Sequence, residues 1–539
     1  MRLKSTGHYL KRIADSWLTA SVHFDAFRYN PRAYLTATKW WIKRKRVRAR
    51  GQFAPLLGQS AKAYMLWALR QDREARKHSP IDTDRPIIAL IDIRGDHSDE
   101  LAATLHSLSA EGLSAFLIGS AETPTLAAAL ARIDWSHTPW LLPLEPGDLL
   151  SPGSAAAYRA AMAGAITRLI YADDDLLVGR RRRTPNFKPD WNSELFQHWD
   201  YISGACLLRA TPSDLEAIND GPDWAERLTN RLAGEGTPLH VREMLHHRRR
   251  RPITCLPARP LDLARELPPI SVIVPTRNRV DLLRVCLDGV AAADYPDVDV
   301  IVADNDSDDP ETLAYLAALD PARYTLLHHG GGFNYSAINN RAVALARGRL
   351  LCLLNNDIEM TDTQWLAVMA TQALRREVGA VGARLLYPDG RIQHAGVVIG
   401  VGNAAGHAHR FLRPDEEGYF HRHSLPQFTS AVTAACLVVE RDKFCAVGGL
   451  NERDFAVAFN DVDLCLRLNQ RGWQSLYEPR ATLMHHESVS RGLDHDPVGA
   501  ARLASELAAL KRIWKTDEIC DPYHHAQLSR ASEQFAVAI

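Results

Sequence analysis

The chain has 539 residues, of which 46% are hydrophobic and 24% charged, as in an ordinary soluble globular protein. Lysine plus arginine and aspartate plus glutamate both total 64, so no net positive field marks a nucleic-acid-binding protein. The length exceeds what one hydrophobic core holds, so two large domains with extensions are expected. Apolar windows are far shorter than the roughly 20 residues of a membrane-spanning helix, and no signal peptide is expected at the N-terminus.

Eight cysteines are spread along the chain without a CxxC pair, and most of them lie in apolar stretches. Such cysteines usually behave as small buried hydrophobic residues rather than as metal ligands or disulfide partners. We therefore expect a cytoplasmic location, because thiols stay reduced there.

Residues 1–80 mix aromatic side chains with positive charge, most densely in the segment 39-KWWIKRKRVRAR-50. This combination is typical of helices at a membrane surface, so the segment predicts a helical extension capable of peripheral membrane contact. An ordinary helix that packs against a domain is the alternative interpretation. The arginine runs at 180–183 and 248–251 are typical of solvated faces.

The second region alternates strands and helices. Its expected strands are 86–93, 115–120 and 139–145, and the expected helices between them are 98–108 and 124–133. The same order recurs more strongly after the proline-rich linker 257–269, so we interpret the chain as an internal duplication.

The third region has near-continuous apolar strands separated by amphipathic helices. The expected strands are 270–276, 298–304, 324–329 and 349–355, and the expected helices are 281–293, 311–319 and 335–348. Gly348 is expected to end the last of these helices. Strands that are apolar throughout indicate a parallel sheet covered on both faces, so the predicted fold class is α/β.

Polar side chains follow two of these strands, at the edge where open α/β sheets bind their ligands. Strand 298–304 ends in Asp304, and strand 349–355 leads into Asn355, Asn356 and Asp357. A carboxylate at this point could hold Mg²⁺ or Mn²⁺ together with substrate phosphates. A turn after the first strand and a helix cap after the second are the alternative interpretations.

Two later segments are also polar. Asp461 and Asp463 open an expected helix, where the helix dipole stabilises carboxylates and where one acid could serve as a general base. His485 and His486 follow a further apolar strand. Histidines at such a place are either metal-ligand candidates or ordinary core and surface residues, and the pattern alone leaves both open.

Taken together, the segments over about residues 268–527 resemble the family 2 glycosyltransferases of the GT-A fold. The resemblance is carried by 270-ISVIVPTRNR-279, 303-ADNDSDD-309, 354-LNND-357, 459-FNDVDLCLRL-468 and 485-HHESVSRG-492, in family order. It points in particular to the bacterial rhamnosyl- and galactofuranosyl-transferase-like enzymes of O-antigen and related polysaccharide biosynthesis. It implies a Rossmann-like nucleotide-diphospho-sugar transferase fold in two tandem modules.

The resemblance also implies roles for individual residues. Asp357 matches the metal-binding acid, and His485 matches a late metal- or diphosphate-contacting histidine, with His486 as the alternative. Asp461 matches the catalytic base, and Asp463 is grouped with it because it would stabilise the helix or orient the acceptor. The implied donor-binding residues are Pro275, Thr276, Asp304, Asn334, Asn355 and Asn356.

The first module departs from the family pattern, so we expect it to be degenerate and non-catalytic. Its metal-binding position is occupied by 143-PLEPGD-148 and its acidic helix by 221-GPDWAERL-228. The expected divisions are a helical N-terminal extension (1–80), a degenerate GT-A-like module (81–256), a catalytic module (268–500) and a helical tail (501–539).

The implied function is an inverting, metal-dependent sugar transfer that uses Mg²⁺ or Mn²⁺. The donor would be a nucleotide sugar such as dTDP-rhamnose or a UDP-sugar, and the acceptor a hydroxyl of a growing surface polysaccharide or lipid-linked glycan. A catalytically inactive nucleotide- or sugar-binding protein is one alternative, and a bifunctional enzyme with two active modules is another.

Overall fold

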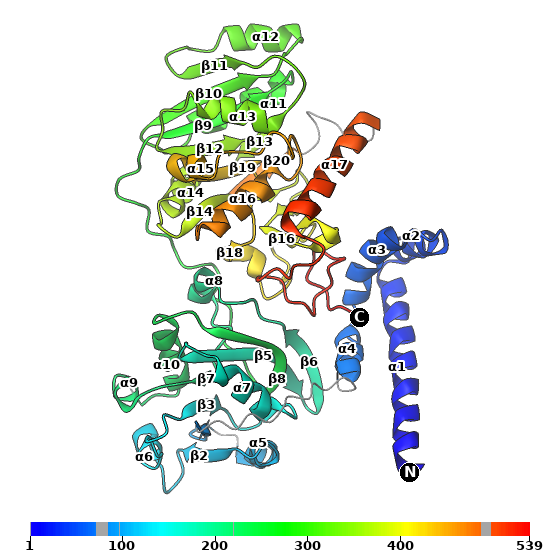
Figure 1. Ribbon diagram of the computed structural model, residues 1–539, viewed down its shortest axis with the longest axis vertical. Helices are drawn as coiled ribbons and strands as arrows, with labels where there is room; N and C mark the ends of the chain where they lie inside the picture. Colours follow the sequence, from blue (N-terminus) through cyan, green and yellow to red (C-terminus); the bar gives the residue numbers. More distant parts are fainter. Residues whose placement is uncertain (1, 72–84, 96–97, 219, 487–496) are drawn as a thin grey trace.

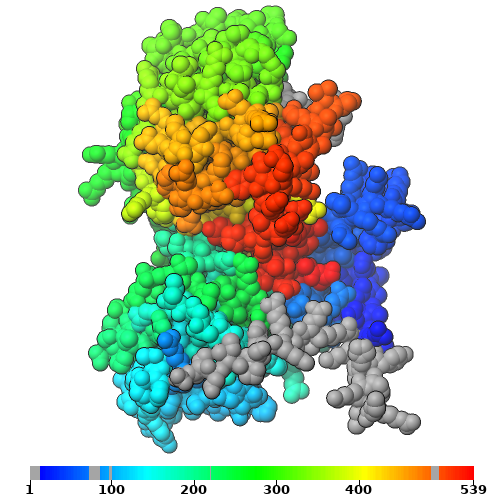
Figure 2. Space-filling view, viewed as in Figure 1, coloured from blue at the N-terminus to red at the C-terminus, as the bar shows by residue number. Residues whose placement is uncertain are grey.

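The structure is a computed structural model that describes residues 2–71, 85–95, 98–218, 220–486 and 497–539. Two α/β modules are stacked along the long axis, with the N-terminal helices at one side (Figure 1). The C-terminal tail, red in Figure 2, fills the space beside the junction of the modules on the face shown. Among the described residues, no helix combines the length and apolar character needed to cross a membrane.

The N-terminal extension is helical, as expected, and it is attached through its last helix. Its helices are α1 (Arg2–Tyr29), α2 (Pro31–Ile42), α3 (Arg46–Gly58) and α4 (Ala63–Gln71). On α4, the Tyr64 hydroxyl donates a hydrogen bond to the buried carboxylate of Asp175 in the first module. Trp67 Nε1 donates to Gln527 Oε1 of the C-terminal tail at 2.8 Å. These buried contacts hold the base of the extension against both partners.

The first module is a mixed sheet covered by helices. Its strands run in the order β2-β1-β3-β7-β5-β8-β4, with β6 paired to β5. The strands are β1 (Ile87–Asp92), β2 (Ser114–Ile118), β3 (Trp140–Leu144), β4 (Leu149–Leu150), β5 (Leu169–Val178), β6 (Arg181–Asn186), β7 (Cys206–Leu208) and β8 (Leu239–Arg248). The helices are α5 (Ser98–Ala110), α6 (Leu126–Leu130), α7 (Ser154–Ala163), α8 (Ser193–His198), α9 (Pro212–Glu216) and α10 (Trp224–Ala233).

The second module has a larger sheet, in the order β11-β10-β9-β12-β19-β14-β20-β13. Its strands are β9 (Ile270–Thr276), β10 (Val298–Asp304), β11 (Tyr324–His328), β12 (Leu350–Leu354), β13 (Ile358–Met360), β14 (Val378–Leu386), β19 (Cys436–Glu440) and β20 (Gln474–His485), with β15 (Ile392–His394) and β18 (Gln427–Thr429) beside them. Strands β16 (Val397–Ile399) and β17 (Ala405–His407) form a separate hairpin. The helices are α11 (Val280–Ala291), α12 (Pro310–Ala317), α13 (Tyr335–Val343), α14 (Trp365–Ala373), α15 (Arg441–Ala446), α16 (Asn460–Gln470) and α17 (Pro497–Trp514).

The two sheets repeat the same topology. In each, three parallel strands (β2-β1-β3 and β10-β9-β12) are followed by an antiparallel strand, β7 or β19. The next two strands are parallel to each other (β5-β8 and β14-β20), and a short antiparallel strand, β4 or β13, completes the order. The internal duplication inferred from the sequence is therefore confirmed at the level of strand order and direction.

Alternate residues of each central strand pack into two separate hydrophobic cores, one on each face of the sheet. The sequences of these strands are therefore apolar throughout. Ile270, Val272 and Val274 of β9 pack on one face with the apolar side of α11, whereas Ile273 belongs to the core on the other face. Burial on both faces requires helices on both sides of the sheet.

The expectation that Gly348 ends helix α13 is wrong. The helix ends at Val343, and Ala344 provides its C-cap. A Cβ atom on Gly348 would lie 2.4 Å from the backbone nitrogen of Ser271 at the start of β9. Glycine is needed there because the chain entering β12 passes directly against the neighbouring strand.

The modules are joined by specific contacts as well as by the irregular linker. The Asn192 side chain caps α8, and it also bonds both backbone groups of Phe428 on β18, at 2.8 and 3.1 Å. Arg375 of the second module pairs with the buried Glu194 at 2.6 Å. After α17 ends at Trp514, residues 515–539 contain no helix, so the expected helical tail is helical only in its first part.

Candidate active site

A cleft of about 960 Å³ opens at the carboxyl ends of β9 and β12 in the second module. Its walls come from the segments that follow these strands, from the loop at 433–435, from the start of α16 and from α17. Of the residues proposed from sequence, this cleft is lined by Pro275, Thr276, Asn355, Asn356, Asp357, Asp461 and His485. Asp357, Asp461 and His485 therefore line one cavity.

Asp357 and His485 meet because β13 pairs with β20. The antiparallel register sets Ile358 opposite His485, so the residue just before β13 lies beside the imidazole. His485 Nε2 is 3.2 Å from Asp357 Oδ1, and both side chains are buried. His485 Nδ1 lies 3.1 Å from Gln393 Oε1, an acceptor that fixes the proton on Nδ1. The lone pair of Nε2 is then directed at the side of Asp357.

This pair fits a divalent cation. In an octahedral shell with bonds of about 2.1 Å, adjacent ligand atoms lie about 3 Å apart, which is close to the separation of Asp357 Oδ1 and His485 Nε2. Two protein ligands leave room for substrate oxygens, as is usual where the cation is shared with a diphosphate. Asn355 also lines the cavity, and Asn356 Nδ2 donates to Thr276 Oγ1 at 3.0 Å, which ties the ends of β12 and β9 together.

His486, the alternative histidine, is directed elsewhere. Its Nε2 lies 2.9 Å from Glu359 Oε2, and only its backbone N–H reaches Asp357, donating to the main-chain oxygen at 3.0 Å. His485 is thus the cleft-lining member of the pair. The rest of the segment 485–492 lies outside the described residues.

Asp461 stands on the other side of the loop at 433–435, in the first turn of α16. Its Oδ2 accepts a hydrogen bond from the backbone N–H of Ala434 at 3.1 Å. The next residue of that loop, Ala435, accepts from the backbone N–H of Asn355 at 2.9 Å. The loop therefore sets the spacing between Asp461 and the end of β12. Burial raises the pKa of Asp461, and backbone hydrogen bonds oppose this rise.

Asp463 does not line the cleft. It is 2% exposed, its Oδ2 pairs with Arg467 at 2.7 Å, and its Oδ1 accepts from Trp514 Nε1 at 2.9 Å. Two residues along a helix turn the side chain by about 200°, so Asp461 and Asp463 face opposite ways. Asp463 joins α16 to α17, which agrees with the helix-stabilising part of its expected role.

Two expected donor-binding residues also lie outside the lining. Asn334 is the N-cap of α13, accepting from the Ala337 backbone N–H at 2.9 Å. Asp304 accepts from the Ser307 backbone N–H at 3.2 Å, so its side chain organises the turn after β10. The neighbouring Asn305 lines the cleft instead. The turn interpretation accounts for the contact with Ser307, and Asp304 also lies 3.5 Å from the His328 imidazole at the end of β11.

Sequence reasoning missed three arginines of the lining, Arg277, Arg279 and Arg502. Arg279 follows β9 at the start of α11, the place where α/β sheets bind phosphates, so its position was a usable signal. Arg502 comes from α17, and no local pattern shows that this helix lies against the cleft. Guanidinium groups suit an anionic ligand, and in this structure Arg279 pairs with Asp281 at 2.6 Å and Arg502 with Glu506 at 3.6 Å.

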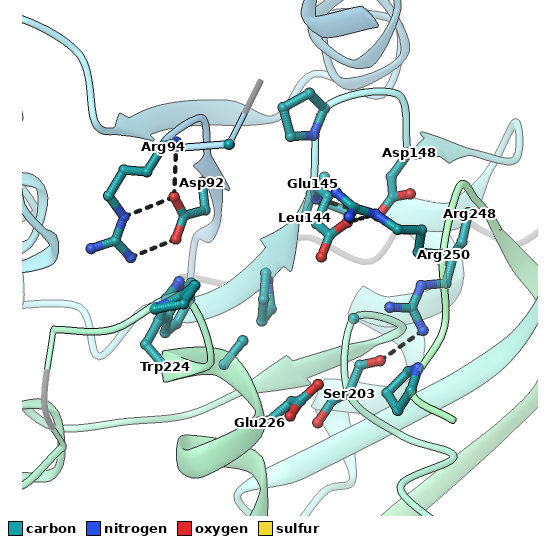
Figure 3. A pocket seen from close by; sticks show the side chains of 17 residues that line it. Asp92, Arg94, Leu144, Glu145, Asp148, Ser203, Trp224, Glu226, Arg248 and Arg250 are labelled. Carbon is teal, nitrogen blue, oxygen red and sulfur yellow. Dashed lines mark hydrogen bonds and ion pairs between the residues drawn. The ribbon is translucent and has the colours of Figure 1, made fainter. Parts of the chain in front are cut away.

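The first module has a hollow of about 500 Å³ at the corresponding edge of its sheet. In Figure 3, Glu145 from the end of β3 lies across this hollow from Trp224 and Glu226 of α10. Arg248 donates to the main-chain oxygen of Ser203 at 2.8 Å. Burial and the nearby carboxylate of Asp200 raise the pKa of Glu226.

The two acids of the second cleft have no counterpart here. Counted from the end of the equivalent strand, β3 or β12, the position of Asp357 is Gly147. Counted from the start of the equivalent helix, α10 or α16, the position of Asp461 is Ala225. The first module therefore lacks an acid at each of these two counted positions, although the carboxylates of Asp92, Glu145, Asp148 and Glu226 line its hollow.

The acidic run Asp173, Asp174 and Asp175 is buried in the first module rather than directed into its hollow. Among the described residues, the one group of three metal-ligand side chains within 4.8 Å of one another is Asp173, His240 and His525. His525 Nδ1 accepts from the Gln527 backbone N–H at 3.1 Å, which leaves its proton on Nε2, 3.0 Å from Asp173. The cluster joins the tail to β5 and β8, and Asp173 Oδ2 and His525 Nε2 lie in contact without a well-aligned hydrogen bond.

Comparisons with known proteins agree with this geometry. Residues 271–406 match the family model "Glycosyl transferase family 2". An uncharacterized protein of Sinorhizobium fredii, y4gI, is 35% identical over 460 residues, which cover 76% of this chain and 51% of the relative. The O-antigen biosynthesis protein RfbC of Myxococcus xanthus is 34% identical over 430 residues, covering 71% of this chain and 33% of the relative.

A third relative matches a shorter part of the chain. The N-acetylglucosaminyl-diphospho-decaprenol L-rhamnosyltransferase of Mycobacterium tuberculosis is 28% identical over 216 residues, which cover 36% of this chain and 69% of that enzyme. This chain spans about half the length of y4gI and a third of RfbC. The fold class expected from sequence, a GT-A α/β fold in two tandem modules, is confirmed by the family match and the duplicated topology. Residues 271–406 therefore match the glycosyltransferase family 2 model, and Asp357 of the cleft lies inside the matched segment, whereas Asp461 and His485 follow it in the sequence.

Proposed function

We propose that the second module transfers a sugar from a nucleotide-sugar donor to a hydroxyl group of a growing bacterial surface glycan, with inversion at the anomeric carbon. One observation carries this proposal: Asp357, His485 and Asp461 line a single cleft at the carboxyl edge of the sheet. A cation site, a base and a cavity of ligand size are what such a displacement needs.

The chain's own residues supply the base and the binding groups. Asp461 accepts the proton of the acceptor hydroxyl while the acceptor oxygen bonds to the anomeric carbon and the bond to the nucleoside diphosphate breaks. Its raised pKa makes the carboxylate a better proton acceptor than an exposed aspartate. Arg279 and Arg502 lie where the diphosphate would leave. Within the described lining the carboxylates are Asp357 and Asp461, so a single displacement by the acceptor fits better than a covalent intermediate.

Asp357 and His485 would hold Mg²⁺ or Mn²⁺, which supplies positive charge to a departing diphosphate. Gln393 keeps His485 in the tautomer that binds a cation. Since Asn355 offers an amide where the family usually has an acid, the cation has one protein charge fewer here and its affinity is expected to be lower.

The donor that fits the relatives best is dTDP-rhamnose, because one of them is named as a rhamnosyltransferase. UDP-sugars are the second choice. The acceptor would be a polysaccharide or a lipid-linked glycan. We place the protein in the cytoplasm, with peripheral contact at the inner membrane face where a lipid-linked acceptor would lie. All eight cysteines are free, in agreement with a reducing compartment.

For the first module we propose a non-catalytic role, because Gly147 and Ala225 stand where the second module has its two acids. Glu226, beside Ala225, is the carboxylate on which a second active site would depend. If both modules were active, an Asp461→Asn protein would still form one linkage.

The test is donor turnover by the full chain with Mn²⁺ or Mg²⁺, starting with dTDP-rhamnose and continuing with UDP- and GDP-linked sugars. Release of nucleoside diphosphate that requires the cation and disappears in Asp461→Asn supports the proposal. Nucleotide binding without turnover in either protein would identify an inactive binding module instead.

A further inference from the structure

The turn between α2 and α3 forms an exposed tip of the N-terminal extension, away from both modules. We define the basic tip as residues 39–50, the end of α2 and the start of α3. Three large apolar side chains are exposed there: Trp41 by 47%, Ile42 by 74% and Val47 by 70%. In Figure 1 the helices α2 and α3 stand apart from both sheets, beside α1.

The same tip carries a dense and unbalanced charge. Its exposed cations are Lys39, Lys43, Arg44, Lys45, Arg46, Arg48 and Arg50. Between Asp25 and Asp72 the sequence has 11 lysine or arginine residues and no acidic residue. Among the described residues that precede the tip, Asp25 pairs with Lys62 at 3.2 Å and Asp15 with Arg70 at 3.3 Å, so both acids already have cationic partners. The tip is therefore a positive patch on a chain of zero net charge.

The geometry points to an anionic phospholipid surface as the partner: we propose that the basic tip docks the protein on a bilayer with negatively charged headgroups. Lysine and arginine attract such headgroups, while tryptophan and aliphatic side chains enter the boundary between headgroups and acyl chains. Arg46 lies over the Trp41 ring at 3.8 Å, so cation and aromatic ring would reach the headgroup level together. This inference extends the proposed function by naming the contact surface.

Two other partners fit less well. Exposed Ile42 and Val47 offer a nucleic acid neither stacking nor hydrogen bonds, whereas a bilayer gains from burying them. A second copy of this chain would bring two equally positive patches together in a twofold interface, and like charges would repel. Both remain distinguishable outcomes of the experiment.

Helices α1 and α4 connect the basic tip to the rest of the protein through buried contacts. Leu18 and Val22 of α1 pack against Leu66 of α4, and α4 is bound to the first module and the tail through Tyr64 and Trp67. Docking of the tip would thus hold both modules near the membrane surface.

The experiment is co-sedimentation of the full chain with sucrose-loaded vesicles of phosphatidylcholine, with and without phosphatidylglycerol. We expect binding to the anionic vesicles alone, weakened by added salt. The charge-reversed variant Lys43→Glu/Arg44→Glu/Lys45→Glu is expected to lose about a hundred-fold or more in vesicle affinity. Ile42→Ser/Val47→Ser should weaken the binding that survives at high salt.

A matched control is offered by the exposed arginines of the first module. Arg180→Glu/Arg181→Glu/Arg183→Glu changes the net charge by the same amount at a different site, and should bind vesicles as the unchanged protein does. Equal loss in both triple variants, or equal binding to neutral and anionic vesicles, would overturn the inference. Two further results would also overturn the inference. One is that the unchanged protein binds no vesicles but forms a dimer, seen by light scattering, that the tip variant does not form. The other is that the unchanged protein binds RNA and not vesicles. Donor turnover with a soluble acceptor is measured in parallel, so failure of docking and failure of the proposed activity are separate results.

Discussion

Replacing Asp461 by asparagine should separate catalysis from stability. Asparagine keeps the size of the side chain and can still accept the hydrogen bond from the Ala434 backbone N–H, but it cannot accept a proton from the acceptor. Loss of a positioned general base typically lowers the rate about 10²- to 10⁴-fold. We expect a fall of this size in kcat for Asp461→Asn.

The stability of the Asp461→Asn protein should be unchanged or higher, although its kcat falls. Burial raises the pKa of Asp461 above its ordinary value of 3.8, so the folded protein binds this proton more tightly than the unfolded chain. The contribution of this carboxyl to stability is therefore present at low pH and is lost as the pH rises through the raised pKa. At neutral pH the charged carboxylate costs stability, and Asp461→Asn should unfold at the same or a higher temperature.

Asp463→Asn is the matched control, two residues along the same helix. It breaks the buried charge pair with Arg467, which should lower the free energy of unfolding by about 1–3 kcal/mol. Its kcat should stay close to that of the unchanged protein. Donor turnover with Mn²⁺ and thermal unfolding of both variants provide the measurements. Retention of turnover within about ten-fold in Asp461→Asn, or an equal catalytic loss in a stable Asp463→Asn protein, would refute the reasoning.

The other predictions concern the cation, the first module and the sheet. His485→Ala should raise the Mn²⁺ concentration for half-maximal turnover about ten-fold or more, measured by metal titration, whereas His486→Ala should leave it nearly unchanged. Glu226→Gln in the first hollow should leave the rate of product formation unaltered, and a lost linkage in mass spectra of the product would show two active modules. Gly348→Ala should lower the free energy of urea unfolding by about 1–3 kcal/mol, because its Cβ would meet Ser271. Gly236→Ala, where a Cβ meets nothing within 4 Å, should have little effect.

The local sequence pattern was sufficient to predict which residues converge in the parallel half of the second module. The carboxyl ends of parallel strands must meet at one edge, so the residues after β9 and β12 converge whatever the details of packing. Asp357 was predicted in that way, whereas Thr276 was implied by the family resemblance, and the structure places both in the cleft. The two-face burial of these strands was likewise readable, because every residue along them is apolar or small.

The antiparallel half depended on the tertiary structure. Strand β20 pairs with β13 across a long stretch of chain, and only this pairing sets His485 rather than His486 beside Asp357. Asp461 and Asp463 look alike in sequence, yet one faces the cleft and the other is held by Trp514 of α17.

The sequence by itself determined the fold class, the duplication and the acids near the sheet edge, because hydrophobic periodicity and the order of strands and helices are local properties. The tertiary structure decided which of two adjacent polar side chains faces the cavity. That choice rests on contacts between residues far apart in the chain, such as Asp463 with Trp514 and Gly348 with Ser271, which no local spacing encodes.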